Sequence, residues 1–107
     1  MDLSFIKQVW LAADKRFLFL RHALSQMARP ERMIETYEVR NVVYKGDLIE
    51  DYPDDPRGHS CLILGFGQND RAIHVCCAPK EEYLSIITAY IPDQEVWTND
   101  FKTRIKK

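Results

Sequence analysis

The residues with the clearest capacity for chemistry are those that can move a proton or hold a negative charge. In this 107-residue chain they are His22, Arg57, His59, His74, Thr88 and Tyr90. These types suit metal-free cleavage of RNA, in which a base activates the ribose 2′-hydroxyl, an acid protonates the leaving oxygen, and a cation stabilises the phosphorane. A single histidine is more often a structural or surface residue, so spacing alone does not establish an enzyme.

Two His-x-Cys pairs raise the alternative of a metal site, namely His59-x-Cys61 and His74-x-Cys76. Their runs predict a hairpin turning at Asn69-Asp70, in which residues whose numbers sum to about 139 face each other. His74 then faces Gly65, and His59 lies about 20 Å further along the strand. Metal–ligand bonds are about 2 Å long, so the sequence predicts neither a metal site nor any other cofactor.

Covalent catalysis by a serine or cysteine is a second alternative. Ser60 directly follows His59, but neighbours in a strand point to opposite faces. The sequence also lacks a Gly-x-Ser-x-Gly elbow. A nucleophilic mechanism is therefore not predicted.

Strand parity groups some of the proton-transfer candidates. On the strand expected over 72–78, His74 points away from the side that carries Ile73 and Val75, while Thr88 and Tyr90 share one side of the strand over 83–90. If those two sides coincide, His74, Thr88 and Tyr90 occupy one open face of a sheet.

Three amphipathic helices precede the strands. Apolar residues at helical spacing predict helices from Leu3 to about Ala12, from Arg21 to Arg29, and from Ile34 or Thr36 to Tyr44. Thr36 is the expected N-cap of the third helix, and Gly46 follows its end. The run 17–20 between the first two helices is expected to be extended.

The rest of the chain predicts an antiparallel meander. Strands are expected over 47–52, 60–66, 72–78 and 83–90, with GQND as the hairpin turn and Pro92 ending the last strand. A tail with a basic end should dock on the body. Helices before strands, without alternation, predict one α+β domain over residues 1–107, with helices on one face of a curved three- to four-stranded antiparallel sheet and the other face free.

The charge is nearly balanced but unevenly placed. The net charge is −1, yet residues 1–45 carry eight Lys/Arg and five Asp/Glu, and residues 46–56 carry five acids and no base. A local basic patch is therefore compatible with this composition. RNA binding through such a patch would depend strongly on salt.

The composition also predicts a cytoplasmic protein. The three cysteines, Cys61, Cys76 and Cys77, suit buried, reduced thiols rather than a disulfide framework. No stretch is long and apolar enough to span a bilayer, and the start lacks the features of a secretory signal. No contact with a membrane is expected.

Several motifs together resemble those of a small bacterial family. They are RHALSQMA, GDLIEDYPDDPRGHSCLILGF, IHV, IITAYIPD and a Trp-x-x-x-Phe-x-x-Arg tail, spanning about residues 17–104. The family is catalogued as a domain of unknown function, and its members are commonly encoded beside a zinc-finger antitoxin of the YgiT/MqsA type. They resemble the toxins of the RelE-like, barnase-related group of metal-independent ribonucleases.

The resemblance implies a RelE/barnase-like fold and a toxin-type endoribonuclease whose partners are RNA and a zinc-finger antitoxin. His22, Thr88 and Tyr90 match its polar positions, so the candidate catalytic residues are His22, His74, Thr88 and Tyr90. Gln26 stands where members often show arginine. Arg21, Arg29 or Arg57 could take the place of that arginine, and the candidate substrate-binding residues are Arg29, Arg57 and His59.

A non-catalytic module is the competing hypothesis. The near-neutral charge and Gln26 favour a degenerate toxin that only contacts an antitoxin. Convergence of His22, Thr88 and Tyr90 beside a cation would favour the enzyme. The oligomeric state, the RNA target and the dependence on the ribosome are not specified by these patterns.

Overall fold

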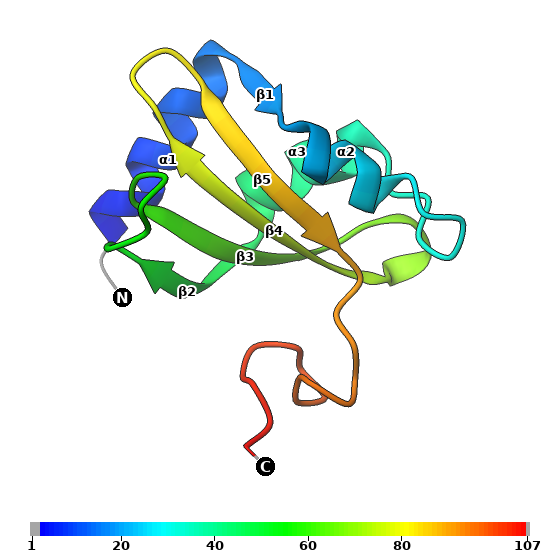
Figure 1. Ribbon diagram of the computed structural model, residues 1–107. Helices are drawn as coiled ribbons and strands as arrows, with labels where there is room; N and C mark the ends of the chain where they lie inside the picture. The colour runs from blue at the N-terminus through cyan, green and yellow to red at the C-terminus, as the bar shows by residue number, and fades with distance from the viewer. Residues whose placement is uncertain (1–2, 107) are drawn as a thin grey trace.

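The protein is an α+β structure in which helices cover one face of a single five-stranded sheet (Figure 1). The computed structural model describes residues 3–106. The helices are α1 (Leu3–Lys15), α2 (Arg21–Met27) and α3 (Thr36–Lys45). The strands are β1 (Phe17–Phe19), β2 (Asp47–Tyr52), β3 (Ser60–Phe66), β4 (Ala72–Pro79) and β5 (Leu84–Tyr90), and a short 3-10 turn, η1 (Gln68–Asp70), joins β3 to β4. None of the helices in these residues is long and apolar enough to cross a membrane.

The sheet has five strands, whereas three or four were predicted, and it is not wholly antiparallel. Its order is β1-β5-β4-β3-β2, and β1 runs parallel to β5. The four strands from β2 to β5 form the predicted meander. The three residues of β1 are too few to carry a strand period, so their pairing depends on the free edge that β5 offers.

The helix-side core forms because the apolar residues of each helix recur at a spacing of three or four. Phe5, Ile6 and Val9 of α1 are buried there, and so are Val39 and Val42 of α3, together with alternate residues of β3, β4 and β5. In Figure 1, α3 lies behind the sheet and α2 lies alongside β5. This layer holds the strands that carry the candidate site.

Two helix ends differ from the prediction. Glu35, not Thr36, is the N-cap of α3, and it forms a capping box in which Glu38 accepts the backbone N–H of Glu35 at 2.9 Å. In return, the side chain of Glu35 accepts the backbone N–H of Glu38, three residues further on. The carboxylate of Glu35 therefore takes the place of the usual hydroxyl in the capping box. The second helix ends at Met27 rather than Arg29, and the chain turns back over residues 29–33, where the N–H groups of Arg32 and Met33 donate to the carbonyl of Arg29. Gly46 ends α3 as predicted, with its N–H bonded to the carbonyl of Val42.

The register confirms the predicted parity. Ile73, Val75 and Cys77 belong to the helix-side core, whereas His74 faces away from it. His74 pairs with Leu64 rather than Gly65, one residue from the expected partner.

On the side of β5, His74 pairs with Tyr90, and Cys76 pairs with Thr88. Directly paired residues project to the same face. His74, Thr88 and Tyr90 therefore share one face, as the parity predicted.

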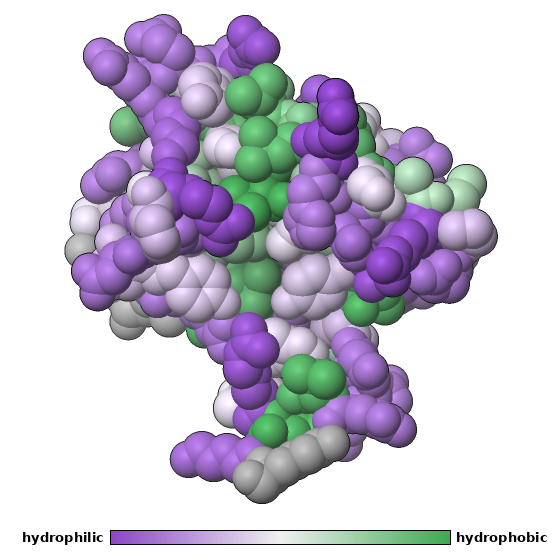
Figure 2. All heavy atoms as spheres, in the orientation of Figure 1, coloured by the Kyte–Doolittle hydropathy of each residue, from purple (hydrophilic) through white to green (hydrophobic). Residues whose placement is uncertain are grey.

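That face is not free, because the segment after β5 covers part of it. This segment, residues 92–106, is called the strap below. Trp97 of the strap is only 3% exposed and packs with Leu62, Cys76 and Ile87 of the sheet. The predicted docked tail is thus present, and the prediction of an uncovered face is wrong. Figure 2 shows an apolar strip between hydrophilic side chains over the sheet, with the strap extending away from the end of β5.

Candidate active site

A histidine and a tyrosine form the centre of the strap-covered face. His74 is fully buried, and its Nδ1 lies 3.1 Å from the hydroxyl of Tyr90. Its Nε2 lies 2.8 Å from the carbonyl oxygen of Phe101. A carbonyl can only accept, so Nε2 carries the proton when His74 is neutral, and Nδ1 accepts from Tyr90.

Burial sets the protonation of both rings. Burial lowers the pKa of His74, against the opposing effects of the Phe101 carbonyl and the negative charge of Glu50. Burial raises the pKa of Tyr90 to about 12, although the positive charges of Arg104 and Arg32 lower it. At neutral pH the pair is therefore a neutral imidazole that accepts a hydrogen bond from a neutral phenol.

Thr88 lies two residues before Tyr90, and a β-bulge adjoins it. The register of β4 against β5 shifts between Cys76 and Cys77, so Ile87 has no direct partner and packs on the strap-covered side. Thr88 pairs with Cys76 on that side and is half-buried. Bulges often redirect a side chain beside a functional site, and here the bulge gathers Ile87 and Thr88 on the face of His74.

An ion pair joins the strap to the edge strand β2. Arg104 donates from Nε and Nη2 to the two carboxylate oxygens of Glu50, at 3.1 and 3.2 Å. Tyr52 also donates to Glu50, and the guanidinium of Arg104 stacks over the ring of Trp97 at 4.6 Å. Glu50 and Arg104 belong to the surroundings of His74, and sequence reasoning missed them. Strand parity could not have found Glu50, because Leu48 packs on the helix side and only the β-bulge between Leu48 and Glu50 lets Glu50 pair with Leu62 on the strap side.

Arg32 is a cation that sequence reasoning did not identify. Its Nη1 donates to the side-chain oxygen of Gln26 at 2.7 Å, so α2 holds it in place. Nothing in its spacing distinguishes it from Arg29. Its positive charge lowers the pKa of Tyr90, with a smaller effect than that of Arg104.

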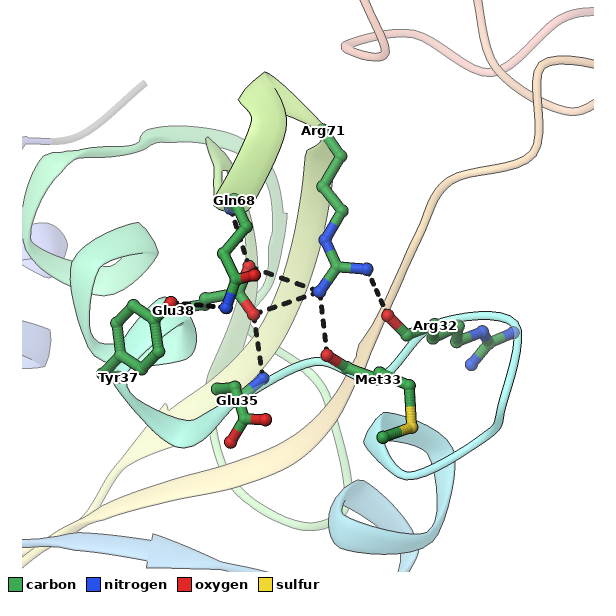
Figure 3. A network of polar contacts seen from close by, with 7 residues as sticks. All are labelled: Arg32, Met33, Glu35, Tyr37, Glu38, Gln68 and Arg71. Carbon is green, nitrogen blue, oxygen red and sulfur yellow. Dashed lines mark hydrogen bonds and ion pairs between the residues drawn. The ribbon is translucent and has the colours of Figure 1, made fainter.

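A second polar cluster fixes the backbone of the loop after α2 (Figure 3). Arg71, just before β4, donates to the carbonyl oxygens of Arg32 and Met33 and to Glu38 of α3 at 3.0 Å. Glu38 is 1% exposed and also accepts the backbone N–H of Gln68 at 2.9 Å. The cluster ties the β3–β4 turn to α3 and to the loop that carries Arg32.

His22 is exposed on α2 and is not joined to this group. The backbone N–H of Leu20 donates to the carbonyl of Ile86 at 3.1 Å, which places the start of α2 beside β5. None of the side-chain hydrogen bonds, ion pairs or ring contacts found among residues 3–106 involves His22. The structure therefore unites His74, Thr88 and Tyr90 on one face, and leaves His22 free in solvent near the same strand.

The three predicted substrate-binding residues do not lie together. Arg29 is exposed and faces Glu31 at 3.8 Å. His59 pairs with Asp51 and stacks on Phe5 of α1 at 3.6 Å, on the helix side. These two residues do not join the site, because the loop geometry that separates them from β5 is set by tertiary packing.

Arg57 does reach the strap-covered face. Asp55 joins Arg57 to Ser60 of β3, whose side chain shares the strap-side parity of Leu62. Burial raises the pKa of the Cys76 thiol to about 11, and the positive charge of Arg57 opposes that rise. Both carboxylate oxygens of Asp55 accept hydrogen bonds from Arg57, at 3.0 and 2.9 Å. A phosphate would have to compete with this carboxylate.

No group of three or more metal-ligating side chains occurs among the residues that the structure describes. The site that these residues define is a hydrogen-bonded histidine–tyrosine pair on the strap-covered face of an α+β sheet. The chain belongs to the family described as Domain of unknown function (DUF4258), which matches residues 19–91. No curated protein and no solved structure gives a significant match. The matched region includes His22, His74, Thr88 and Tyr90, and it ends at the residue before the strap.

Proposed function

We propose that this protein cleaves RNA by metal-independent acid–base catalysis and acts as the toxin of a bacterial toxin–antitoxin pair. The observation that supports the reaction is the hydrogen-bonded pair of His74 and Tyr90. The motif resemblance supports the toxin role, for which we propose a cytoplasmic location. The proposed partners are an RNA substrate and a zinc-finger antitoxin.

The proton path follows from the hydrogen bonds. Tyr90 accepts the proton of the ribose 2′-hydroxyl while it passes its own proton to Nδ1 of His74, because a phenol with a pKa of about 12 cannot serve as a base alone. The 2′-oxygen attacks phosphorus and forms a cyclic phosphate. The imidazolium that results is stabilised by the negative charge of Glu50.

The leaving 5′-oxygen needs a proton from the other side of the phosphate. His22 fits this role, since it is exposed and its helix begins beside β5. Arg32 and Arg57 are the proposed cations that stabilise the negative charge of the phosphorane, since the charge of Arg32 acts on Tyr90 and that of Arg57 acts on Cys76, the strand partner of Thr88. Gln26, which stands where family members often show arginine, holds Arg32 at this position.

A direct test is the incubation of single-stranded RNA with purified protein in the presence of EDTA. Tyr90→Phe should lower the rate of cleavage about 100-fold, because it removes the relaying hydroxyl. Tyr83→Phe is the matched control: it removes a hydroxyl from the residue just before the same strand, where the structure records no side-chain partner. His22→Ala should also lower the rate, with Ser25→Ala on the same helix as its control. Failure of wild type to cleave any RNA would reject the enzyme.

The second candidate function is a non-catalytic module that contacts an antitoxin. It is favoured by one observation, the complete burial of His74 beneath Trp97. A protein that binds a co-expressed zinc-finger partner with unchanged affinity after Tyr90→Phe, and that cleaves no RNA, would fit this alternative.

A further inference from the structure

The strap folds upon itself rather than joining the sheet. Its backbone hydrogen bonds within residues 3–106 join strap residues to one another, for example Thr98 to Thr103 and Ile105 to Val96, and Trp97 forms an isolated bridge with Arg104. Side chains make its connections to the sheet, through Trp97, the Arg104–Glu50 pair and the Lys102–Asp47 pair. The strap is therefore a small unit that can be perturbed without breaking strand pairing.

One backbone group of the strap points at the candidate site. The carbonyl oxygen of Phe101 lies 2.8 Å from Nε2 of His74. Phe101 has a φ of 61°, in the left-handed region that a bulky side chain rarely adopts. Such backbone strain persists only where surrounding contacts impose it, and it is common at functional sites. At Phe101 this conformation is held by a turn, in which the N–H of Phe101 donates to the carbonyl of Thr98.

We propose that the strap is a positioning element of the active site, in which the Phe101 carbonyl keeps the proton of His74 on Nε2 so that Nδ1 is free to accept from Tyr90. This inference rests on the proposed function. It extends the site beyond residue 91, where the match to the family ends.

The physical reason is that a neutral imidazole carries its single proton on either nitrogen. With the proton on Nδ1, His74 would be a donor toward Tyr90 and could not take the proton that the relay delivers. The Phe101 carbonyl disfavours this alternative. With the proton on Nδ1, the lone pair of Nε2 would face the carbonyl oxygen of Phe101, and two acceptors would meet in a buried site. Trp97 encloses the ring, with its centroid 4.4 Å from that of His74 at an interplanar angle of 85°.

The remaining groups that face His74 act on its charge. They are Tyr90 of β5, Glu50 of β2 and Arg104 of the strap. Arg104 opposes the protonation of His74, but it also binds both carboxylate oxygens of Glu50 and so holds the counter-charge close. Removal of the strap would therefore change the tautomer, the solvation and the charge balance of His74 together.

The test compares Trp97→Ala, which removes the cover, with Trp97→Phe, which keeps an aromatic ring there, and with Lys106→Ala as a control on the exposed strap. Nitrogen NMR of labelled His74 reads the tautomer directly, whether or not the protein cleaves RNA. Far-ultraviolet circular dichroism checks that the sheet remains folded, and Arg104→Gln serves as a second strap variant if Trp97→Ala does not fold.

Wild type, Trp97→Phe and Lys106→Ala should show the proton on Nε2, and Trp97→Ala should show a mixture of tautomers. RNA cleavage by Trp97→Ala should fall about 10- to 100-fold, as is typical when an orienting partner of a histidine is lost. The acid limb of its pH–rate profile should move to higher pH, because burial no longer lowers the pKa of His74.

Two outcomes would overturn the inference. One is an unchanged Nε2 tautomer in a folded Trp97→Ala protein, and the other is faster cleavage by that variant, which would make the strap an inhibitory cover. If no variant and no wild type cleaves RNA while the tautomer still changes in Trp97→Ala, the proposed function fails and the positioning of His74 by the strap stands.

Discussion

Two buried polar clusters lie at the same end of the sheet, and they differ in how their charge is arranged. The Arg71–Glu38 cluster, on the helix side, pairs a guanidinium with a carboxylate that is 1% exposed. The His74–Tyr90 cluster, on the strap side, buries an imidazole and a phenol that are both neutral at pH 7. One cluster holds fixed charges and the other holds a proton that can move.

The difference extends to the way each cluster is built. Arg71 binds two backbone carbonyls and Glu38 accepts two backbone N–H groups, so the first cluster fixes the chain path of a loop and a helix cap. His74 binds the hydroxyl of Tyr90 and one carbonyl of the strap, and within residues 3–106 the strap makes no backbone hydrogen bond to the sheet. We infer that the first cluster mainly stabilises the fold, and that the second is adapted to chemistry at little cost to the fold.

The largest expected effect is on the first cluster. Glu38→Ala leaves the partly buried guanidinium of Arg71 without its counter-charge and removes the reciprocal half of the capping box of α3. We expect the free energy of unfolding to fall by about 3–5 kcal/mol, as is typical when one partner of a buried ion pair is removed. Urea unfolding measures the change.

Glu31→Ala is the control for this prediction. Glu31 faces Arg29 at 3.8 Å, and both side chains are more than half exposed, so its loss should change stability by less than about 1 kcal/mol. Equal effects of the two substitutions would show that the Arg71–Glu38 cluster has no special role in stability.

The pH dependence separates the two clusters. The pKa of His74 is lower in the folded state than its ordinary value of 6.5, so its contribution to stability is present above pH 6.5 and is lost as the pH falls below that value. For Glu38, burial raises the pKa, but hydrogen bonds from Glu35, Gln68 and Arg71 bring the net value below the ordinary 4.5, so its contribution is lost only below pH 4.5. Urea unfolding between these two values should therefore report loss at His74 alone.

The control for this prediction is His74→Gln, which cannot take up a proton in that range. Its stability should change less than that of wild type between about pH 7.5 and about pH 5.5. A parallel decline of the two proteins would assign the pH dependence to other groups.

The smallest effect is expected at the outer attachment of the strap. Lys102 and Asp47 lie 3.5 Å apart with both side chains at least half exposed, and an exposed pair contributes at most about 1 kcal/mol. Lys102→Ala should leave urea unfolding and the His74 tautomer nearly unchanged. A large loss of either would mean that this pair, rather than Trp97, holds the strap in place.

Most of the fold could be predicted because its signals are local. The hairpin turn, the strand parity around His74 and the end of α3 at Gly46 each depend on residues that are close in sequence. The parallel strand β1 and the glutamate cap of α3 were not predicted. Each needs information from outside the segment: a free edge on β5 in one case and the partners of Glu38 in the other.

The candidate site could be predicted only in part. Parity placed His74, Thr88 and Tyr90 on one face, since side chains alternate along strands. Arg32 was missed in favour of Arg29, because both follow the same helix and only the folded loop distinguishes them. The prediction that the face is free was wrong, because local spacing does not show where a tail docks.

The sequence by itself determined the strand period that turns His74 away from the helices and the residue types that can transfer a proton. Only the tertiary structure decided that a carbonyl of Phe101, 27 residues further along the chain, meets His74 and that Arg104 binds Glu50. The reason is physical: side-chain direction follows from local backbone geometry, whereas a contact between distant segments depends on the packing of the whole chain. The neutral state of His74 also depends on the packing of distant segments, because burial lowers its pKa and Trp97 of the strap packs against its ring.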